Sequence, residues 1–203
     1  MDKKKRSVGA SERDERSREE YRFRVGHQPA GSFVVIDECG SNINLAPRYA
    51  RAPKGERAYV QVPRNTLENT TLIASMTASG LGPAMTLAGA TDRAAFEAYV
   101  ERVLAPCLTP GQVVVLDNLS AHKGRRVQTL IEDRGCRLWF LPSYSPDLSP
   151  IEEAFSKLKA QLRKAQARSR EALEVAISEA LDAITPGDAQ AFLHHCGYGT
   201  AVP

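Results

Sequence analysis

Apolar residues recur at strand spacing in the first part of the chain and at helix spacing later. Short apolar runs between turn residues predict β-strands. These runs cover 33–37, 43–46, 58–62, 69–77, 83–87, 113–117 and 137–141. Apolar residues three or four apart predict helices. Those helices run from Thr91 to Pro106, over about 121–134, from Pro150 onward, and over about 169–184 and 187–195. This order predicts a mixed sheet followed by α/β alternation, in a single domain.

Several of the predicted helices have local end signals. Thr91 or Asp92 is a natural N-cap, and Pro106 ends that helix. Gly135 closes the next helix. The segment Ser149–Glu152 reads Ser-Pro-Ile-Glu, a capping box with proline at the first helical position.

Residues 1–26 are rich in charge and poor in large apolar side chains. We expect them to form a flexible, solvated arm, or a frayed helix from Ser11 through Arg24. The folded domain is then expected over residues 27–198, with a short tail at 199–203.

Charge is distributed unevenly. The net charge is +3, and residues 1–24 hold nine Lys or Arg against six Asp or Glu. The rest of the chain is therefore neutral, although 42% apolar and 25% charged residues are ordinary globular values. Any surface that binds nucleic acid must come from local basic clusters.

The chain contains no apolar run long enough to span a membrane, and its N-terminus has no apolar stretch typical of a secretory signal. Four widely spaced cysteines form no Cys-x-x-Cys pair, so neither a disulfide framework nor a zinc ribbon is expected. We expect a cytoplasmic protein.

Two apolar runs end directly in an acidic residue. The run 33–36 is followed by Asp37, and the run 113–116 is followed by Asp117. Fully apolar strands fit a sheet covered on both faces, and ligand sites in such sheets lie beyond the carboxyl ends of the strands. A single Asp in this place is more often a turn residue. Two of them, followed by Glu152, favour a shared site.

Glu152 has two explanations. The capping box is a sufficient local reason for a glutamate there. On a helix, however, Glu152 shares a face with Lys159 and Arg163, beside the apolar stripe of the same helix. That face suits a helix whose start meets a metal ion and whose flank meets phosphates.

A cluster of three carboxylates is unfavourable unless cations neutralise it. Mg²⁺ and Mn²⁺ prefer oxygen ligands and keep positions for water and phosphate. Two such ions about 4 Å apart can promote displacement at phosphorus. The three acids therefore predict two Mg²⁺ or Mn²⁺ ions and phosphoryl transfer.

Two segments carry specific motifs around these acids. One contains Asp-Asn-x-x-x-His over 117–122, and the other contains Ser-Pro-Asp-x-x-Pro-Ile-Glu over 145–152. Both strongly resemble the catalytic domain of bacterial insertion-sequence transposases of the Tc/mariner superfamily. The 34 residues between Asp117 and Glu152 match the DDE spacing of that superfamily. The resemblance covers residues 30–198. It implies a ribonuclease-H-like fold, and cleavage and joining of double-stranded DNA at transposon ends.

The resemblance also implies roles for individual residues. Asp37, Asp117 and Glu152 would be the catalytic residues and metal ligands. Asn118 and His122 would contact phosphate or the metal-binding carboxylates. Without the motif, His122 would be taken for an ordinary surface histidine.

Other acids near these positions have simpler explanations. Asp147 belongs to the motif, but a turn between two prolines accounts for it. Glu38 and Glu153 are interpreted as neighbouring acids that do not bind metal. Basic residues then become candidates for DNA contacts, with an ordinary solvated surface as the alternative. They are Arg48, Arg51, Lys54, Arg57, Lys123, Lys159 and Arg163.

The chain departs from the family pattern in three places. Cys39 and Ser149 stand where the family usually has Thr and Asn. Relatives carry N-terminal helix-turn-helix modules, and residues 1–26 are too short for one. We therefore expect the second half of a split or frameshifted gene, a truncated remnant, or an isolated catalytic domain. An upstream-encoded helix-turn-helix partner, a homodimer in the active state, and association with the bacterial nucleoid are further expectations.

Three functions remain open at this point. The leading one is a DDE transposase that cleaves DNA and transfers the strand. The second is a ribonuclease-H-like nuclease that does not transfer strands. The third is an inactive remnant that binds DNA or transposase subunits.

Overall fold

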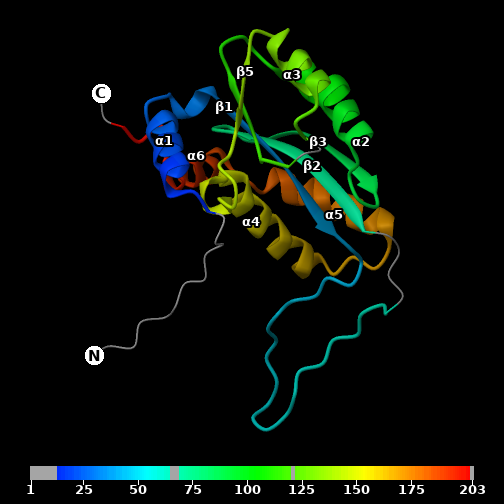
Figure 1. Cartoon of the computed structure of the whole chain (residues 1–203). Helices are drawn as coiled ribbons and strands as arrows, with labels where there is room; N and C mark the ends of the chain where they lie inside the picture. Colours follow the sequence, from blue (N-terminus) through cyan, green and yellow to red (C-terminus); the bar gives the residue numbers. More distant parts are fainter. Residues whose placement is uncertain (1–12, 65–68, 120–121, 202–203) are drawn as a thin grey trace, which may run out of the picture.

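Five strands form one mixed sheet with helices on both faces (Figure 1). The computed structural model describes residues 13–64, 69–119 and 122–201. The strands are β1 (Phe33–Ser41), β2 (Thr70–Thr77), β3 (Gly80–Ala88), β4 (Val113–Leu116) and β5 (Arg137–Phe140). Their order across the sheet is β3-β2-β1-β4-β5. The pairs β1/β2 and β2/β3 are antiparallel, whereas β1/β4 and β4/β5 are parallel. The predicted mixed sheet followed by α/β alternation is confirmed.

Six α-helices accompany the sheet in the described part of the chain. They are α1 (Glu15–Gly26), α2 (Arg93–Tyr99), α3 (Arg125–Glu132), α4 (Pro150–Ala165), α5 (Arg170–Asp182) and α6 (Pro186–His195). Asp92 caps α2 as predicted, because its carboxylate accepts a hydrogen bond from the Ala95 amide. Within the described ranges, no helix has the length and apolar character needed to cross a membrane.

The helix predicted from Thr91 changes its winding before it ends. After α2 the chain continues as a π-helical segment η2 (Val100–Leu104) and a 3-10 turn η3 (Ala105–Cys107). Pro106 has no amide hydrogen and cannot continue the α-helical ladder. The predicted span is therefore correct, but only its first half is α-helical. Helix α3 begins at Arg125, later than predicted, and residue 121 of that prediction lies outside the described part.

Side chains of the central strands alternate between two apolar cores. On β1, Phe33 and Val35 join the core under α1, α4, α5 and α6, whereas Val34 and Ile36 join the core under α2, η2 and α3. This alternation is the period of two that every strand imposes on its side chains. The sheet is covered by helices on both faces, as its apolar strands predict.

Residues 15–26 are not a flexible arm. They form α1, whose N-cap Asp14 accepts hydrogen bonds from the amides of Arg16 and Ser17. Tyr21 and Val25 are buried in the core beside α6. Of the two expectations for this segment, the solvated arm is wrong and the helix is confirmed, because two apolar residues four positions apart dock one helix face. Residues 1–12 of the expected arm lie outside the described part of the chain. The other faces of α1 carry so many charged residues that the composition of the segment does not reveal the apolar stripe of Tyr21 and Val25.

The connection between β1 and β2 also differs from prediction. The strands expected at 43–46 and 58–62 are absent from its described residues, and positions 51–62 are all exposed. In Figure 1 this segment extends away from the sheet and its helices. An isolated apolar run without a neighbouring strand leaves its backbone groups unpaired, so propensity alone does not make a strand.

Candidate active site

Asp37 and Asp117 belong to neighbouring parallel strands and lie on the same face of the sheet. Asp117 directly follows β4, as predicted, whereas β1 continues to Ser41, so the prediction that the strand ends at Asp37 is wrong. Asp37 instead pairs with Ala74 of β2.

The last pair in the β1/β4 register is Val35 with Val115. Asp37 and Asp117 each lie two residues further along. Side chains two positions apart on a strand share a face, so both aspartates belong to the face that carries Val35 and Val115. That is the face covered by α4.

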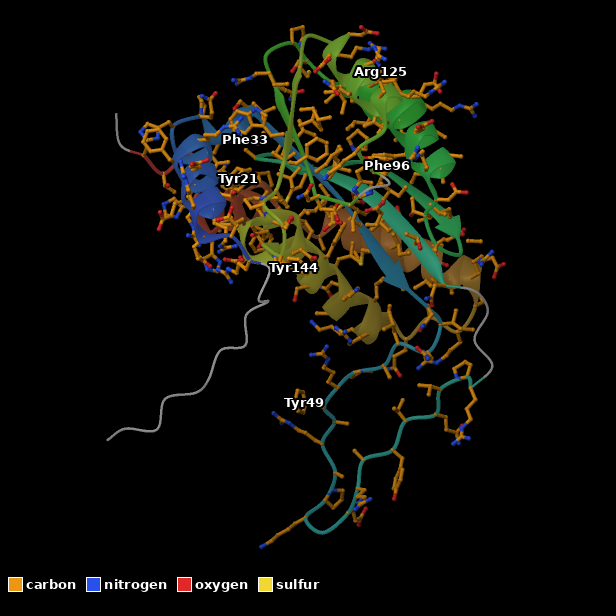
Figure 2. The ribbon with its side chains drawn as sticks, in the orientation of Figure 1. Tyr21, Phe33, Tyr49, Phe96, Arg125 and Tyr144 are labelled. Carbon is orange, nitrogen blue, oxygen red and sulfur yellow. The ribbon has the colours of Figure 1, made fainter. Side chains whose placement is uncertain are left out.

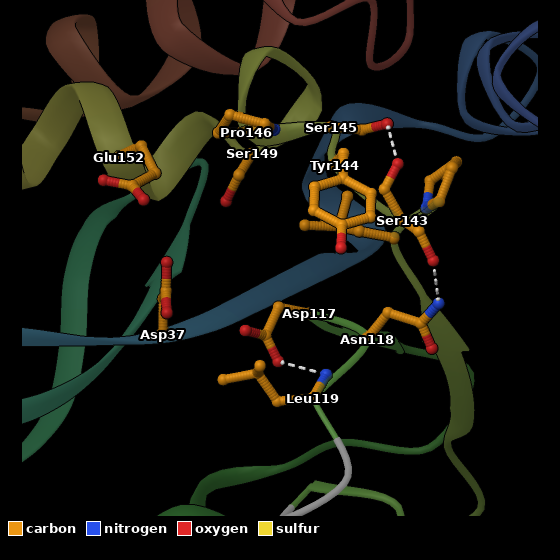
Figure 3. Close-up of a pocket in the computed structure, with 12 residues that line it drawn as sticks. Asp37, Asp117, Asn118, Leu119, Ser143, Tyr144, Ser145, Pro146, Ser149 and Glu152 are labelled. Atoms are coloured by element: carbon orange, nitrogen blue, oxygen red, sulfur yellow. Dashed lines mark hydrogen bonds between the residues drawn. The ribbon is translucent and has the colours of Figure 1, made fainter. Parts of the chain in front are cut away.

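Helix α4 brings the third acid to the same face. Its apolar stripe, which includes Ile151, Phe155 and Leu158, is buried against the sheet as predicted. Glu152 lies next to this stripe in the first turn of the helix. Asp37, Asp117 and Glu152 together line one pocket of about 390 Å³ (Figure 3).

The capping-box explanation of Glu152 is wrong. Ser149 is the N-cap of α4, but its side chain makes no capping hydrogen bond. In a capping box, the glutamate side chain accepts a hydrogen bond from the amide of the N-cap residue. The Ser149 amide instead donates to the carbonyl oxygen of Pro146 at 3.0 Å. Ser149 is buried on the pocket wall. Glu152 is therefore left to face the pocket.

Asp37 lies in an environment that disfavours its charge. Burial, together with the nearby carboxylates of Glu152, Glu38 and Asp117, raises the pKa of Asp37 to about 7, although the Glu38 amide donates to it. A cation in the pocket would reverse this unfavourable balance. The donor set consists of carboxylate oxygens, which are the ligands that Mg²⁺ and Mn²⁺ prefer.

The three acids do not converge on one point. Across the described ranges, no three His, Cys, Asp or Glu side chains are arranged to hold a single metal ion. An ion that takes only one or two carboxylates completes its coordination with water or phosphate oxygens. Mg²⁺ is commonly bound in this way.

His122 connects Asp117 to a fourth acid. Its Nδ1 lies 2.5 Å from Asp117 Oδ1, and its Nε2 lies 2.9 Å from Glu38 Oε1. The ring is 2% exposed and stacks on Phe96, with the ring centroids 4.2 Å apart. Burial lowers the pKa of His122, but the hydrogen bonds with Asp117 and Glu38 outweigh it and raise the pKa to about 9. His122 is therefore protonated at neutral pH and donates to both carboxylates.

The same contact keeps Asp117 ionised. Burial alone would raise the pKa of Asp117, but hydrogen bonds from His122 and from the Leu119 amide lower it below its usual range. Glu38, which the sequence places among the neighbouring acids that do not bind metal, contacts His122 and forms the far end of this chain of contacts. The sequence could have indicated this position of Glu38. It lies an even number of residues after Val34 and Ile36, so its side chain belongs to the sheet face that packs on Phe96.

Asn118 ties the end of β4 to the turn before α4. Its side-chain amide donates to Ser143 Oγ at 2.8 Å. Ser145 Oγ in turn donates to the Ser143 carbonyl oxygen at 3.1 Å. Asn118, Ser143 and Ser145 all line the pocket beside the acids (Figure 3). The structure thus brings both predicted residues to the site. Asn118 contacts the turn before α4, and His122 contacts Asp117.

Asp147 has a partner that the sequence does not reveal. It accepts two hydrogen bonds from the Arg18 guanidinium of α1, at 3.0 and 2.5 Å. The Arg18 side chain is completely buried. The interpretation of Asp147 as a plain turn residue is therefore incomplete. Asp147 lies in the 3-10 turn η5 (Pro146–Leu148) directly before α4, so this contact holds the segment that leads into Glu152.

A buried pair of tyrosines holds the same turn. Tyr198, which follows α6, donates its hydroxyl to the Leu148 carbonyl oxygen at 3.0 Å. The Tyr21 hydroxyl of α1 lies 2.7 Å from the Tyr198 hydroxyl. Segments near both ends of the chain therefore contact the turn that carries one wall of the pocket.

Three of the seven predicted basic residues lie beside Glu152. Arg48, Lys159 and Arg163 line a hollow of about 220 Å³ that Glu152 also borders. Basic side chains next to the acid pocket suit a phosphate backbone. The remaining four are exposed on the β1–β2 connection or, for Lys123, just before α3. They are Arg51, Lys54, Arg57 and Lys123.

The sequence matches the family model described as "DDE superfamily endonuclease" over residues 32–174. The matched region includes all three pocket acids. The chain belongs to the DDE superfamily of endonucleases. No curated protein sequence matches the chain.

Solved structures similar to this DDE endonuclease chain include those of Mos1 transposase. A paired-end complex with the left transposon end gives a TM-score of 0.73 at 19% identity, covering 97% of this chain and 64% of that one. The catalytic domain of Mos1 mariner transposase gives 0.62 at 17% identity, covering 95% and 91%. The paired-end complex with Mg gives 0.72 at 18% identity, covering 97% and 64%. The chain thus spans less than two thirds of the Mos1 chain in these complexes.

This likeness confirms the predicted ribonuclease-H-like fold of the DDE endonuclease chain. The bacterial insertion-sequence branch stays a prediction.

Proposed function

We propose that this chain is a transposase catalytic domain that cleaves DNA at transposon ends and joins the freed 3′ end to a target. The observation that carries the proposal is the meeting of Asp37, Asp117 and Glu152 around one pocket, from two strands and a helix, within a DDE endonuclease fold. Mos1, the structural neighbour, is a transposase described with a transposon end and in a strand transfer complex. Strand transfer by this chain is part of the proposal.

Divalent ions are part of the proposed chemistry. Two Mg²⁺ or Mn²⁺ ions bound in the pocket would neutralise the acids, activate the attacking oxygen and stabilise the leaving one. Mos1 structures are described with Mg and with Mn. Water would be the nucleophile in cleavage, and the freed 3′ hydroxyl would be the nucleophile in joining.

The residues of the chain have distinct tasks in this scheme. Asp37, Asp117 and Glu152 would hold the ions. Protonated His122 donates to Asp117 Oδ1 and keeps this carboxylate in one orientation toward the pocket. Asn118 fixes the neighbouring turn through Ser143.

The basic hollow beside Glu152 binds the DNA backbone in this scheme. Arg48, Lys159 and Arg163 lie within reach of a strand that enters the acid pocket past Glu152. The four exposed basic residues extend this surface along the duplex. Double-stranded DNA of the transposon end and of the target is the proposed substrate.

The expected assembly completes the proposal. We infer a homodimer in the active state, an upstream-encoded helix-turn-helix portion that selects the transposon ends, and a bacterial cytoplasmic protein that associates with the nucleoid on DNA.

Two assays test the proposal without knowledge of the end sequence. Nicking of a supercoiled plasmid in Mn²⁺ measures cleavage, and joining of an oligonucleotide with a free 3′ hydroxyl to that plasmid measures strand transfer. Asp117→Asn and Glu152→Gln are expected to abolish both activities while the protein stays folded by circular dichroism, since each change removes a ligand charge at constant size.

The outcomes separate the three functions. Cleavage without joining would indicate the nuclease that lacks strand transfer, and inactivity of the wild type in both assays would indicate the DNA-binding remnant. Full activity of Asp117→Asn or Glu152→Gln would overturn the metal site.

A further inference from the structure

Trp139 is the only tryptophan of the chain, and two guanidinium groups lie over its ring. Arg24 Cζ is 4.1 Å from the ring centroid, and Arg137 Cζ is 5.3 Å from it. Arg24 belongs to α1, whereas Arg137 and Trp139 belong to β5. Cation–π attraction holds both charged groups near the ring. We call these three residues the α1–β5 patch.

The charge of the patch differs from that of the other arginines of α1. Each of those arginines lies within ion-pair distance of a carboxylate; they are Arg16, Arg18 and Arg22. Among the residues that the structure describes, neither Arg24 nor Arg137 forms an ion pair with a carboxylate, and both are exposed. The patch is therefore a positive surface without an anionic partner in the described part of the chain.

Packing orders the patch before any ligand binds. The Trp139 ring meets Phe33 edge to face, with the ring centroids 6.0 Å apart, and Phe33 is completely buried. Figure 2 shows Phe33 at the end of the sheet next to α1. Arg137 also donates a hydrogen bond to Gln28 Oε1 at 2.9 Å. Because the side chains are already held in place, a ligand would lose less of its binding energy to ordering them.

The patch lies on the same face of the sheet as the acids. Trp139 pairs with Val115 of β4, and Asp117 follows Val115 by two positions, so all three share one face. Leu141, two residues after Trp139, lines the acid pocket. Two residues of extended chain cover about 7 Å, and duplex DNA carries about four phosphate charges over that length. One duplex can therefore contact the pocket and the patch together.

We propose that the α1–β5 patch binds the phosphate backbone of the DNA that flanks the cleaved position. The inference rests on the proposed function, because it takes DNA as the ligand of this chain. A guanidinium donates two parallel hydrogen bonds to phosphate oxygens, which makes arginine well suited to this contact. Backbone contacts carry no sequence information, so the patch adds affinity for any duplex and positions it on the protein.

A protein strand is the alternative occupant. β5 is the last strand in the sheet order, and an edge strand can pair with a strand of another molecule. A second copy of this chain would bring its own Arg24 and Arg137 to the same edge, and repulsion between these like charges opposes such pairing. A polyanion is attracted instead. The charge of the patch therefore favours DNA over a second copy.

Trp139 reports on the patch directly, because its fluorescence is the only tryptophan signal of the chain. The test titrates the wild-type chain with a labelled duplex of arbitrary sequence in EDTA, which prevents cleavage. Anisotropy of the label measures total DNA binding, and Trp139 emission measures occupancy of the patch. We expect both signals to change together. The Kd should rise steeply with salt, because each phosphate contact adds about 0.9 to the slope of log Kd against log salt.

The decisive variant combines Arg24→Gln with Arg137→Gln. We expect its Kd to be about tenfold or more above that of the wild type at low salt, and its salt slope to be smaller by about 2. The change in Trp139 emission should disappear. The matched control combines Arg93→Gln with Arg102→Gln, which removes the same charge from two exposed arginines of α2 and η2. It is expected to bind as the wild type does.

A charge-conserving variant separates binding from folding. Arg24→Lys with Arg137→Lys keeps both positive charges but loses the planar groups over the ring. It is expected to recover most of the DNA affinity and the salt slope of the wild type. A lysine variant as weak as the glutamine variant would show that the arginines act on the structure of α1 and β5, and would overturn the proposal.

The other outcomes are equally distinct. An unchanged salt slope in the glutamine variant, or DNA binding that leaves Trp139 emission unchanged, would overturn the patch. Self-association of the DNA-free chain that changes Trp139 emission would indicate strand pairing at β5 and would also overturn it. DNA binding at the patch by a wild type that cannot nick plasmid in Mn²⁺ would support this inference and contradict the proposed function.

Discussion

The two walls of the acid pocket are positioned by different kinds of contact. On the sheet wall, Asp37 lies within β1 and is paired with Ala74 of β2, and Asp117 directly follows β4, so the sheet positions both acids. On the turn wall, Glu152 depends on a segment that is held by side chains from both ends of the chain. The comparison shows that one site can combine acids that are fixed locally with an acid that is fixed from a distance.

Different physical terms maintain the two walls. The sheet wall is surrounded by fully buried aliphatic residues, and burial there disfavours the charge of Asp37. The turn wall relies on a buried guanidinium and two buried hydroxyls. Mutations on the sheet wall should therefore affect chemistry first, and mutations on the turn wall should affect position and stability together.

The largest effect is expected from Asp37→Asn on the sheet wall. Cleavage should fall by several orders of magnitude because a metal ligand is lost. The metal-free variant should nevertheless be more stable than the wild type, since burial and the neighbouring carboxylates raise the pKa of Asp37 to about 7.

The sign of this stability effect depends on pH. A carboxyl whose pKa is higher in the folded state destabilises the fold increasingly from the unfolded pKa, about 4, up to the folded pKa. Asp37→Asn should therefore unfold with a free energy about 1–3 kcal/mol higher than that of the wild type at pH 8, and with little difference at pH 4. Urea unfolding in EDTA measures the free energy of unfolding of the two proteins at both pH values. A less stable variant at pH 8 would contradict the account of the sheet wall.

The next effect is expected from Arg18→Met on the turn wall. The change keeps an apolar side chain of similar length but removes both hydrogen bonds that Asp147 accepts from Arg18. Asp147 is half exposed, and Arg13 and Arg22 also lie 3.8 Å from it, so we expect a loss of about 1.5–3 kcal/mol of stability, as for a hydrogen bond to a charged group. The rate of plasmid cleavage, measured below the melting temperature of the variant, should fall about tenfold or more, because the turn no longer holds Glu152 in one position.

Lys157→Met is the matched control for Arg18→Met. Lys157 pairs with Asp188 at 2.6 Å, outside the turn before α4. This variant should keep wild-type cleavage. Equal activity losses in both variants would show that the turn has no special dependence on Arg18.

A smaller effect is expected from Tyr198→Phe. The Leu148 carbonyl oxygen loses its donor and Tyr21 loses its hydroxyl partner, while the packing of the ring is kept. A buried polar group left unpaired costs about 1–3 kcal/mol. Thermal unfolding should show this loss, and cleavage should fall less than in Arg18→Met. A cleavage rate below that of Arg18→Met would reverse the proposed ranking of the two contacts.

The smallest effect is a pH dependence of the turn wall. The Arg18 guanidinium holds the pKa of Asp147 below its usual range. A carboxyl whose pKa is lower in the folded state stabilises the fold at pH values above its pKa in the unfolded state. This stabilisation is lost as the pH falls toward its pKa in the folded state. The difference in unfolding free energy between wild type and Asp147→Asn should therefore be constant from pH 7 to about 5 and shrink below about 4. A difference that grows in acid would contradict the pairing.

The sequence predicts the sheet wall better than the turn wall for a physical reason. Period-two alternation and the apolar runs before Asp37 and Asp117 are local signals, and they place both acids on one face. The stripe of α4 is likewise local. Arg18 and Asp147 lie 129 positions apart, and Tyr198 and Leu148 lie 50 apart. No periodicity links residues at such separations.

Local signals also misled in two places. The Ser-Pro-Ile-Glu segment has the sequence of a capping box, but the Ser149 amide already donates a hydrogen bond to the Pro146 carbonyl oxygen. The charge of residues 1–26 concealed the docking face of α1, which Arg18, Tyr21 and Val25 share. In both cases a tertiary contact outweighed the local preference.

The most direct test of the metal-dependent site is the position of the metal itself. Crystals of the wild-type chain soaked in Mn²⁺ and measured at the manganese absorption edge should show anomalous peaks between Asp37, Asp117 and Glu152. Asp37→Asn crystals should lose them. A wild-type map without manganese beside these three carboxylates, or with manganese bound only elsewhere, would contradict the account.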